Sequence, residues 1–166
     1  MIKKNFETWT YEEVEDTFSL VKVNQFDLFE QWLAASHEPD HVRTVLLDEI
    51  RKDLIEYANS WNEDELKMCF ISPLIALVHY SNSQYKIFTQ RNLSAKVMGL
   101  KGKEIELKGR VEFIVAQGKQ DPRHPYFFVH EYKQEARRDN DPLGQLLGAM
   151  IAAQHKNKDF HFIAPM

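Results

Sequence analysis

The chain has 166 residues, of which 43% are hydrophobic and 12% aromatic, which is enough for one globular domain with its own core and argues against a disordered chain. No run approaches the roughly 18 apolar residues of a membrane-spanning helix. A single cysteine excludes an internal disulfide, and a formal net charge of −4 argues against a uniformly basic nucleic-acid binder.

Residues 1–60 are predicted to form a small helical segment. No apolar stretch follows the first residues, so we expect no secretory signal and a cytoplasmic protein. Thr10 and Glu13 have the spacing of a capping box, with Trp9 and Val14 as a hydrophobic staple around it. Apolar residues then recur at helical spacing over 26–33 and 42–57, separated by a Pro-containing break. These helices would form a cap or a partner-facing appendage.

A second capping pattern opens a helix at Asn62–Glu65. We expect this helix to run from about residue 63 to about residue 80 and to bend at Pro73, which cannot donate its amide and crowds the preceding turn. Its apolar positions form one stripe: Leu66, Phe70, Leu74, Leu77 and Val78. The stripe predicts a helix that docks on a sheet.

From Tyr85 the residue pattern becomes typical of strands. We predict strands at 85–97, 105–117 and 126–133, joined by a turn at 98–103 and a loop at 118–125. Asp141-Pro142 then predicts a helix that runs to about His155, with Asp as the cap and Pro at the first helical position. Small residues four apart on this helix (Gly144, Gly148 and Ala152) would let another backbone approach closely.

A last strand is predicted at 160–164, which gives residues 61–166 the order α-β-β-β-α-β. This order predicts an α/β domain with a mixed central sheet flanked by helices. Charge differs between the halves of the chain: residues 1–83 hold 7 Lys and Arg against 16 Asp and Glu, whereas residues 84–166 hold 14 against 9. A basic half suits a phosphate backbone, although an ordinary solvated surface would show the same balance.

Two acidic residues end strand patterns whose other members are apolar. Glu112 shares a strand face with Ile114 and Ala116, and Glu131 shares one with Val129 and Lys133. Isolated carboxylates in such places need compensation, and one lysine supplies a single positive charge for two acids. A hard divalent cation such as Mg²⁺ or Mn²⁺ would supply the rest, whereas the plainer interpretation is a surface ion pair.

An acid on one strand, a second strand that ends in acid-any residue-lysine, and a helix that opens near a glutamine together resemble the PD-(D/E)XK, or restriction-endonuclease-like, nucleases. Gly109–Glu112 is similar to the first acidic motif of that family and Glu131–Lys133 to the second. Residues 62–74 resemble the preceding helix, above all in the nuclease domains of type I restriction enzyme motor subunits. Relatives usually continue past the last strand, so we expect a truncated or compact version of the fold.

The resemblance implies a role for each residue that matches the motifs. Glu112, Glu131 and the carbonyl of Tyr132 would bind the metal, and Lys133 would orient the attacking water. The family more often has aspartate at the first acid and a proline before it, so Glu112 and the residue preceding it depart from the pattern. The DNA path would be lined by Arg137, Arg138, Lys156 and Lys158.

Two further residues have competing interpretations. The family would make Glu65 an auxiliary catalytic carboxylate, but the capping box gives it a structural job. Gln145 would contact DNA or steady the site from the first turn of its helix, unless it is a surface glutamine.

The sequence therefore favours a magnesium- or manganese-dependent DNA endonuclease that belongs to a restriction or defence system. The first alternative is an inactive nucleic-acid-binding or protein-interaction module that kept the fold, with other subunits of a restriction system as partners. The second is a nuclease that cleaves RNA, because phosphodiester chemistry does not identify the sugar. The oligomeric state is not indicated by any pattern.

Overall fold

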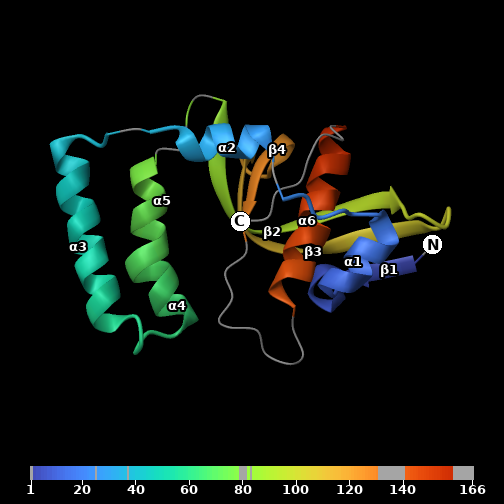
Figure 1. Cartoon of the computed structure of the whole chain (residues 1–166), viewed down its shortest axis with the longest axis horizontal. Helices are drawn as coiled ribbons and strands as arrows, with labels where there is room; N and C mark the ends of the chain where they lie inside the picture. The colour runs from blue at the N-terminus through green and yellow to red at the C-terminus, as the bar shows by residue number, and fades with distance from the viewer. Residues whose placement is uncertain are drawn as a thin grey trace. The chain divides into compact units, whose positions relative to one another are not determined.

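The computed structural model describes residues 2–24, 26–36, 38–78, 82, 84–130 and 141–158, and at Leu28, Trp32 and 124–130 it describes the backbone alone. The chain divides into two compact units (Figure 1). The sheet unit comprises residues 1–23 and 81–166, and the helical unit comprises residues 24–80. This division differs from the predicted boundary near residue 60, because the first 23 residues pack with the sheet.

The sheet has four strands: β1 (Ile2–Asn5), β2 (Tyr85–Met98), β3 (Glu104–Gln117) and β4 (Arg123–His130). The central strand is β3, which pairs with β1 in parallel and with β2 and β4 antiparallel. The predicted α/β class and the mixed sheet are therefore confirmed. Strand β1 was not predicted, and the strand predicted at 160–164 lies outside the described residues.

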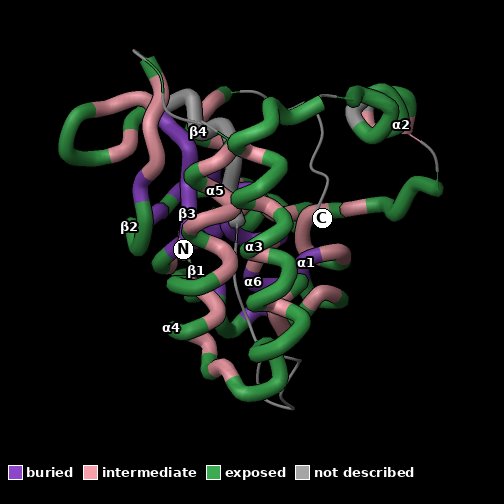
Figure 2. The backbone as a smooth tube through the Cα atoms, turned by 90° about the vertical axis from the view of Figure 1, so that its left-hand side faces the viewer, coloured by how far each residue is buried: buried purple, intermediate pink, exposed green. Residues whose placement is uncertain are grey.

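One face of the sheet is covered by η1 (Phe6–Thr8), α1 (Tyr11–Phe18) and α6 (Pro142–Asn157). Figure 2 shows that the buried residues are concentrated in the central strand β3 and in α6. Phe6 is fully buried, and its ring lies on β3, where a Cβ at Gly109 would meet ring atom Cδ2 at 2.4 Å. The core of the sheet unit thus depends on residues near the start of the chain.

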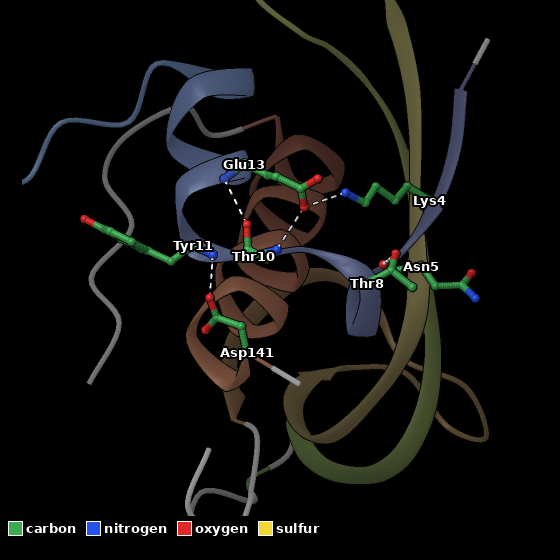
Figure 3. A network of polar contacts seen from close by, with 7 residues as sticks. All are labelled: Lys4, Asn5, Thr8, Thr10, Tyr11, Glu13 and Asp141. Carbon is green, nitrogen blue, oxygen red and sulfur yellow. Dashed lines mark hydrogen bonds and ion pairs between the residues drawn. The ribbon is translucent and has the colours of Figure 1, made fainter. Parts of the chain in front are cut away.

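The predicted capping box at the start of α1 is confirmed. The amide of Glu13 donates to Thr10 Oγ1 at 3.2 Å, and the amide of Thr10 donates to Glu13 Oε2 at 3.1 Å. Lys4 Nζ donates to the same carboxylate at 2.7 Å (Figure 3). Trp9 and Val14, the predicted staple, are both buried in the core.

Asp141 caps α6 as predicted, since its Oδ1 accepts from the amides of Leu143 at 3.0 Å and Gly144 at 3.1 Å. The predicted close approach along α6 occurs at Gly144, where a Cβ would meet the Trp9 carbonyl oxygen at 2.4 Å. Glycine is required there because the neighbouring atoms belong to backbone.

The helical unit contains α2 (Asp27–Ala34), α3 (His41–Tyr57), α4 (Glu63–Leu66), η2 (Lys67–Ile71) and α5 (Ser72–Val78). The predicted break before α3 is confirmed, and Asp40 caps that helix. Segment η2 is a turn of π-helix in which the amide of Ser72 donates to the carbonyl of Lys67. This wider turn ends two residues before Pro73, which has no amide to donate, and such bulges are a recognised way of bending a helix.

The docking of the apolar stripe of residues 66–78 on the sheet stays a prediction. Segments η2 and α5 contact α3, and all three lie in the helical unit. None of the described side chains in this unit is buried. Among the described residues, no helix has the length and apolar character needed to cross a membrane.

Candidate functional site

Glu112 lies where β3 changes from alternating buried and exposed residues to a continuously buried run. Lys108 and Arg110 before it are exposed, whereas residues 113–116 after it are all buried. The strand period had indicated that Glu112 is enclosed together with Ile114 and Ala116. In the structure those two residues are buried, whereas Glu112 is half-buried. Its carboxylate can therefore reach solvent, as a metal ligand at the rim of a sheet must.

Gln90 lies across from Glu112 on β2 and was not predicted as a site residue. Its side-chain amide donates to Glu112 Oε2, and its carbonyl oxygen accepts from Arg110 Nε at 3.2 Å. The ladder pairs Thr89 with Phe113 and Arg91 with Val111, and between these pairs Gln90 has a φ of 55°. A non-glycine residue in the left-handed region is uncommon and often marks a functional or strained position.

The register of β3 and β4 sets what can lie beside Glu112. Phe113 pairs with His130, Ile114 with Val129 and Val115 with Phe128. The predicted site residues that follow β4 in sequence lie outside the described residues: Glu131, Tyr132, Lys133, Arg137 and Arg138. The last described pair is Phe113 with His130. Phe113 is next to Glu112 in sequence, and His130 is next to Glu131.

Gln145 is buried, with 2% of its surface exposed, so the interpretation as a surface glutamine was wrong. It lies in the first turns of α6, a helix that packs against β4. Among the described residues, no group donates a hydrogen bond to its Oε1. A buried polar atom without a partner costs about 1–3 kcal/mol, so this oxygen is positioned to accept from a further group.

Glu65 performs the structural job that was its competing interpretation. Its amide donates to Asn62 Oδ1 at 3.0 Å, and its Oε2 accepts from the Asn62 amide at 2.7 Å. The residue is exposed and belongs to the helical unit. Beside it, Glu63 forms an ion pair with Lys67 at 2.6 Å. The described contacts of Glu65 thus account for it as a helix cap.

Lys156 and Lys158 lie at the carboxyl end of α6, whereas Gln145 lies near its amino end. Both lysines are exposed, and Lys158 ends the helix in the left-handed conformation with a φ of 56°. Cations at a helix carboxyl terminus are stabilised by the helix dipole. Their position is explained by this role.

Of the residues predicted to bind the metal, Glu112 is the one that the structure describes. In the part of the chain that the structure describes, no three His, Cys, Asp or Glu side chains are grouped as metal ligands. The second predicted ligand, Glu131, lies outside that part. The described contribution is thus a carboxylate oxygen of the kind that Mg²⁺ and Mn²⁺ prefer, which accepts from the side-chain amide of Gln90.

Comparison with known proteins gives no match to a family model, a curated protein or a solved structure.

Proposed function

We propose that this chain is a divalent-metal-dependent DNA endonuclease with a restriction-endonuclease-like fold. The order of α5, β2, β3, β4 and α6 supports this proposal, because it matches the helix, three strands and helix expected of that fold. The three strands are antiparallel neighbours, with the strand of the first acid in the centre.

The observation that carries the proposal is the pairing of Phe113 with His130. We propose that this register continues for one more pair and brings Glu131 opposite Glu112. Directly opposed residues on antiparallel strands have Cβ atoms about 4.5–5.5 Å apart, which is close enough for two carboxylates to share one cation. Like charges at that distance repel each other, and a bound cation would relieve the repulsion.

In this proposal Glu112, Glu131 and the carbonyl of Tyr132 bind Mg²⁺ or Mn²⁺. When bound, the ion would act as a Lewis acid on the phosphate and lower the pKa of a water molecule. Lys133 orients the water and stabilises the negative charge that develops on the phosphate. Gln145 steadies the site through its buried side-chain amide. Its Oε1 accepts no hydrogen bond from a described residue and can therefore accept one from a group of the site.

A non-catalytic module is the second candidate, and the contact between Gln90 and Glu112 favours it. A carboxylate that accepts from a neighbouring amide already has a structural partner and requires no metal. In that case the fold would present a binding surface without cleaving. Cleavage assays separate the two candidates.

The test is cleavage of supercoiled, linear and single-stranded DNA, and of RNA, with Mg²⁺, with Mn²⁺ and with chelator. We expect DNA cleavage that needs the ion, and a loss on the order of 10²-fold or more in both Glu112→Gln and Lys133→Ala. Glu104→Gln is the matched control, since Glu104 is an exposed carboxylate on the same strand. Cleavage that persists in both site variants would come from a contaminant and would refute the proposal.

Metal binding has its own readout. A ligand that binds only the folded state stabilises it by RT ln(1 + [L]/Kd), or about 2.7 kcal/mol at 100 times Kd. Mn²⁺ should therefore raise the melting temperature of the natural chain and of Glu104→Gln, but not that of Glu112→Gln. An equal rise in all three would place the ion elsewhere.

A further inference from the structure

Over residues 92–98 of β2 and 104–111 of β3, the sheet unit has one covered face and one open face. In these two segments the buried residues alternate with exposed or half-buried ones, so Leu93 and Leu107 point toward the core while their neighbours point away from it. The exposed residues on the outer side are Asn92, Ser94 and Lys96 of β2 and Lys108 and Arg110 of β3. We call these five residues the basic sheet face. Four of them lie opposite one another in the ladder, with Asn92 paired to Arg110 and Ser94 to Lys108, whereas Lys96 is paired to Glu106.

Positive charge is concentrated in this part of the molecule. Residues 89–111, the half of the hairpin that carries the basic sheet face, hold six Lys and Arg against two Glu, a net charge of +4. The whole sheet unit holds 17 Lys and Arg against 14 Asp and Glu, a net charge of +3. The helical unit holds 4 against 11, a net charge of −7. The hairpin is therefore positive although the chain as a whole is negative.

A shallow hollow of about 440 Å³ lies in the open face. Its polar lining includes Asn92, Ser94, Lys108 and Arg110, together with Asn5 of β1. These side chains offer amide, hydroxyl, ammonium and guanidinium donors, which are the groups that bind phosphate oxygens. Two acids also line the hollow. Glu106 forms an ion pair with Lys3 at 3.4 Å. Glu7 then adds one negative charge to a lining that holds two positive ones, Lys108 and Arg110.

Gln90 connects the basic sheet face to the candidate site. Its carbonyl oxygen accepts from Arg110, and its side-chain amide donates to Glu112. The exposed donors and the carboxylate thus follow one another along β3 at two-residue spacing, from Lys108 through Arg110 to Glu112. A chain of phosphates that lies on the basic sheet face would lead to that carboxylate.

We propose that the basic sheet face binds the sugar-phosphate backbone of a nucleic acid and guides it to Glu112. The role of Glu112 as the point of cleavage rests on the proposed nuclease function, whereas the binding does not. None of the five residues of the face is a large apolar side chain, and the buried centre of a protein–protein interface is usually apolar and poor in charge. Phosphate contacts are sequence-independent, which suits a surface without an apolar recognition pocket.

The test measures the affinity for fluorescein-labelled 20-nucleotide single-stranded DNA and the matching duplex by fluorescence anisotropy, in chelator so that nothing is cleaved. In the double variant Lys108→Gln/Arg110→Gln we expect binding at least about 10-fold weaker at 0.1 M salt. The slope of log affinity against log salt for the duplex should fall by roughly 1.8, since each lost phosphate contact contributes about 0.9.

Arg51→Gln/Lys52→Gln is the matched control, because it also removes one Arg and one Lys, both exposed, but from α3. It changes the net charge equally and should leave affinity and slope as they are. Lys108→Arg/Arg110→Lys should restore the slope, and circular dichroism verifies that every variant is folded. Unchanged binding in Lys108→Gln/Arg110→Gln, or an equal loss in the control, would overturn the proposal. A loss of DNA affinity found only in Lys156→Gln/Lys158→Gln would also overturn it. Binding of a protein to this face in place of DNA would do the same.

The two proposals fail in different ways. If the natural chain binds DNA through the basic sheet face and cleaves nothing with either ion, the nuclease proposal fails and the binding surface stands. If the chain cleaves DNA but Lys108→Gln/Arg110→Gln binds it with unchanged affinity and slope, the surface fails and the nuclease stands.

Discussion

The amide of Tyr11 donates to Asp141 Oδ2 at 2.6 Å, across 130 residues of sequence. The other oxygen of the same carboxylate caps α6, so one side chain serves the amino termini of two helices (Figure 3). Both termini carry partial positive charge, which a carboxylate stabilises. Asp141 therefore joins α1 to α6.

Replacing Asp141 with alanine should cost more than the loss of an ordinary cap. We expect Asp141→Ala to lower the free energy of unfolding of the sheet unit by about 2 kcal/mol, the upper end for a cap, because two helix termini lose an acceptor. Asp40→Ala is the control, since Asp40 caps α3 alone and should cost about 1 kcal/mol. Hydrogen exchange of the β3 amides measures the first effect. Equal costs in the two variants would show that the contact with Tyr11 contributes nothing.

Alanine substitution at two glycines of α6 should have effects of opposite sign. A Cβ at Gly144 would meet backbone atoms of residues 9–11 at 2.4–2.8 Å, so Gly144→Ala should destabilise by about 1–3 kcal/mol. At Gly148 the nearest atoms are 3.5 Å away, an ordinary contact, and alanine favours a helix over glycine by up to about 1 kcal/mol. Urea unfolding of both variants gives the comparison. Stabilisation by Gly144→Ala would mean that α1 is not held so close to α6.

The ion pair of Lys4 and Glu13 should make stability depend on pH. The hydrogen bond from Lys4, followed by that from the Thr10 amide, lowers the pKa of Glu13 below its ordinary value of 4.5. Because the pKa is depressed in the folded state, the stabilisation is fully present above about pH 4.5 and is lost as the pH falls through the lowered pKa.

NMR titration of Glu13 in the natural chain and in Lys4→Met checks this expectation. The pKa should move back toward 4.5 in the variant, and the difference in stability between the two proteins should shrink below that pH. Half of the Glu13 side chain is exposed, so solvent screens the effect and a small difference is expected. An identical pKa in both proteins would contradict the pairing.

Gln145 should be needed for cleavage but not for stability. Its Oε1 has no donor among the described residues, so Gln145→Leu should keep or raise the melting temperature while it lowers the cleavage rate about 10-fold or more. Gln154→Leu on the same helix is the control and should leave the rate unchanged. A fall in melting temperature with an unchanged rate would make the amide a structural residue instead.

Local signals in the sequence predicted local structure well. The capping residues Thr10, Asn62 and Asp141 were identified because a cap and the backbone amides that donate to it lie within three residues of one another. The strands predicted at 85–97 and 105–117, and the described part of the strand predicted at 126–133, lie at the observed places because their composition and alternation are local too. The close approach at Gly144 followed from the spacing of small residues.

Pairing across long stretches of chain was not predictable. Residues 2–5 contain two lysines and an asparagine, and only their pairing with residues 105–108 of β3 makes them a strand. The burial of Gln145 depends on what packs over α6, and the contact of Glu112 with Gln90 joins residues 22 apart in sequence. None of these features has a signature within a few residues of sequence.

The sheet unit is discontinuous in sequence, with the helical unit inserted after residue 23. Trimming the protein from its front end would therefore not isolate the sheet. A fragment that starts at residue 61 would lose β1 together with Phe6, Trp9 and Val14, and Phe6 and Val14 are fully enclosed in the core. Excision of the insertion, with a short linker in its place, is the dissection that keeps the enclosed side chains together.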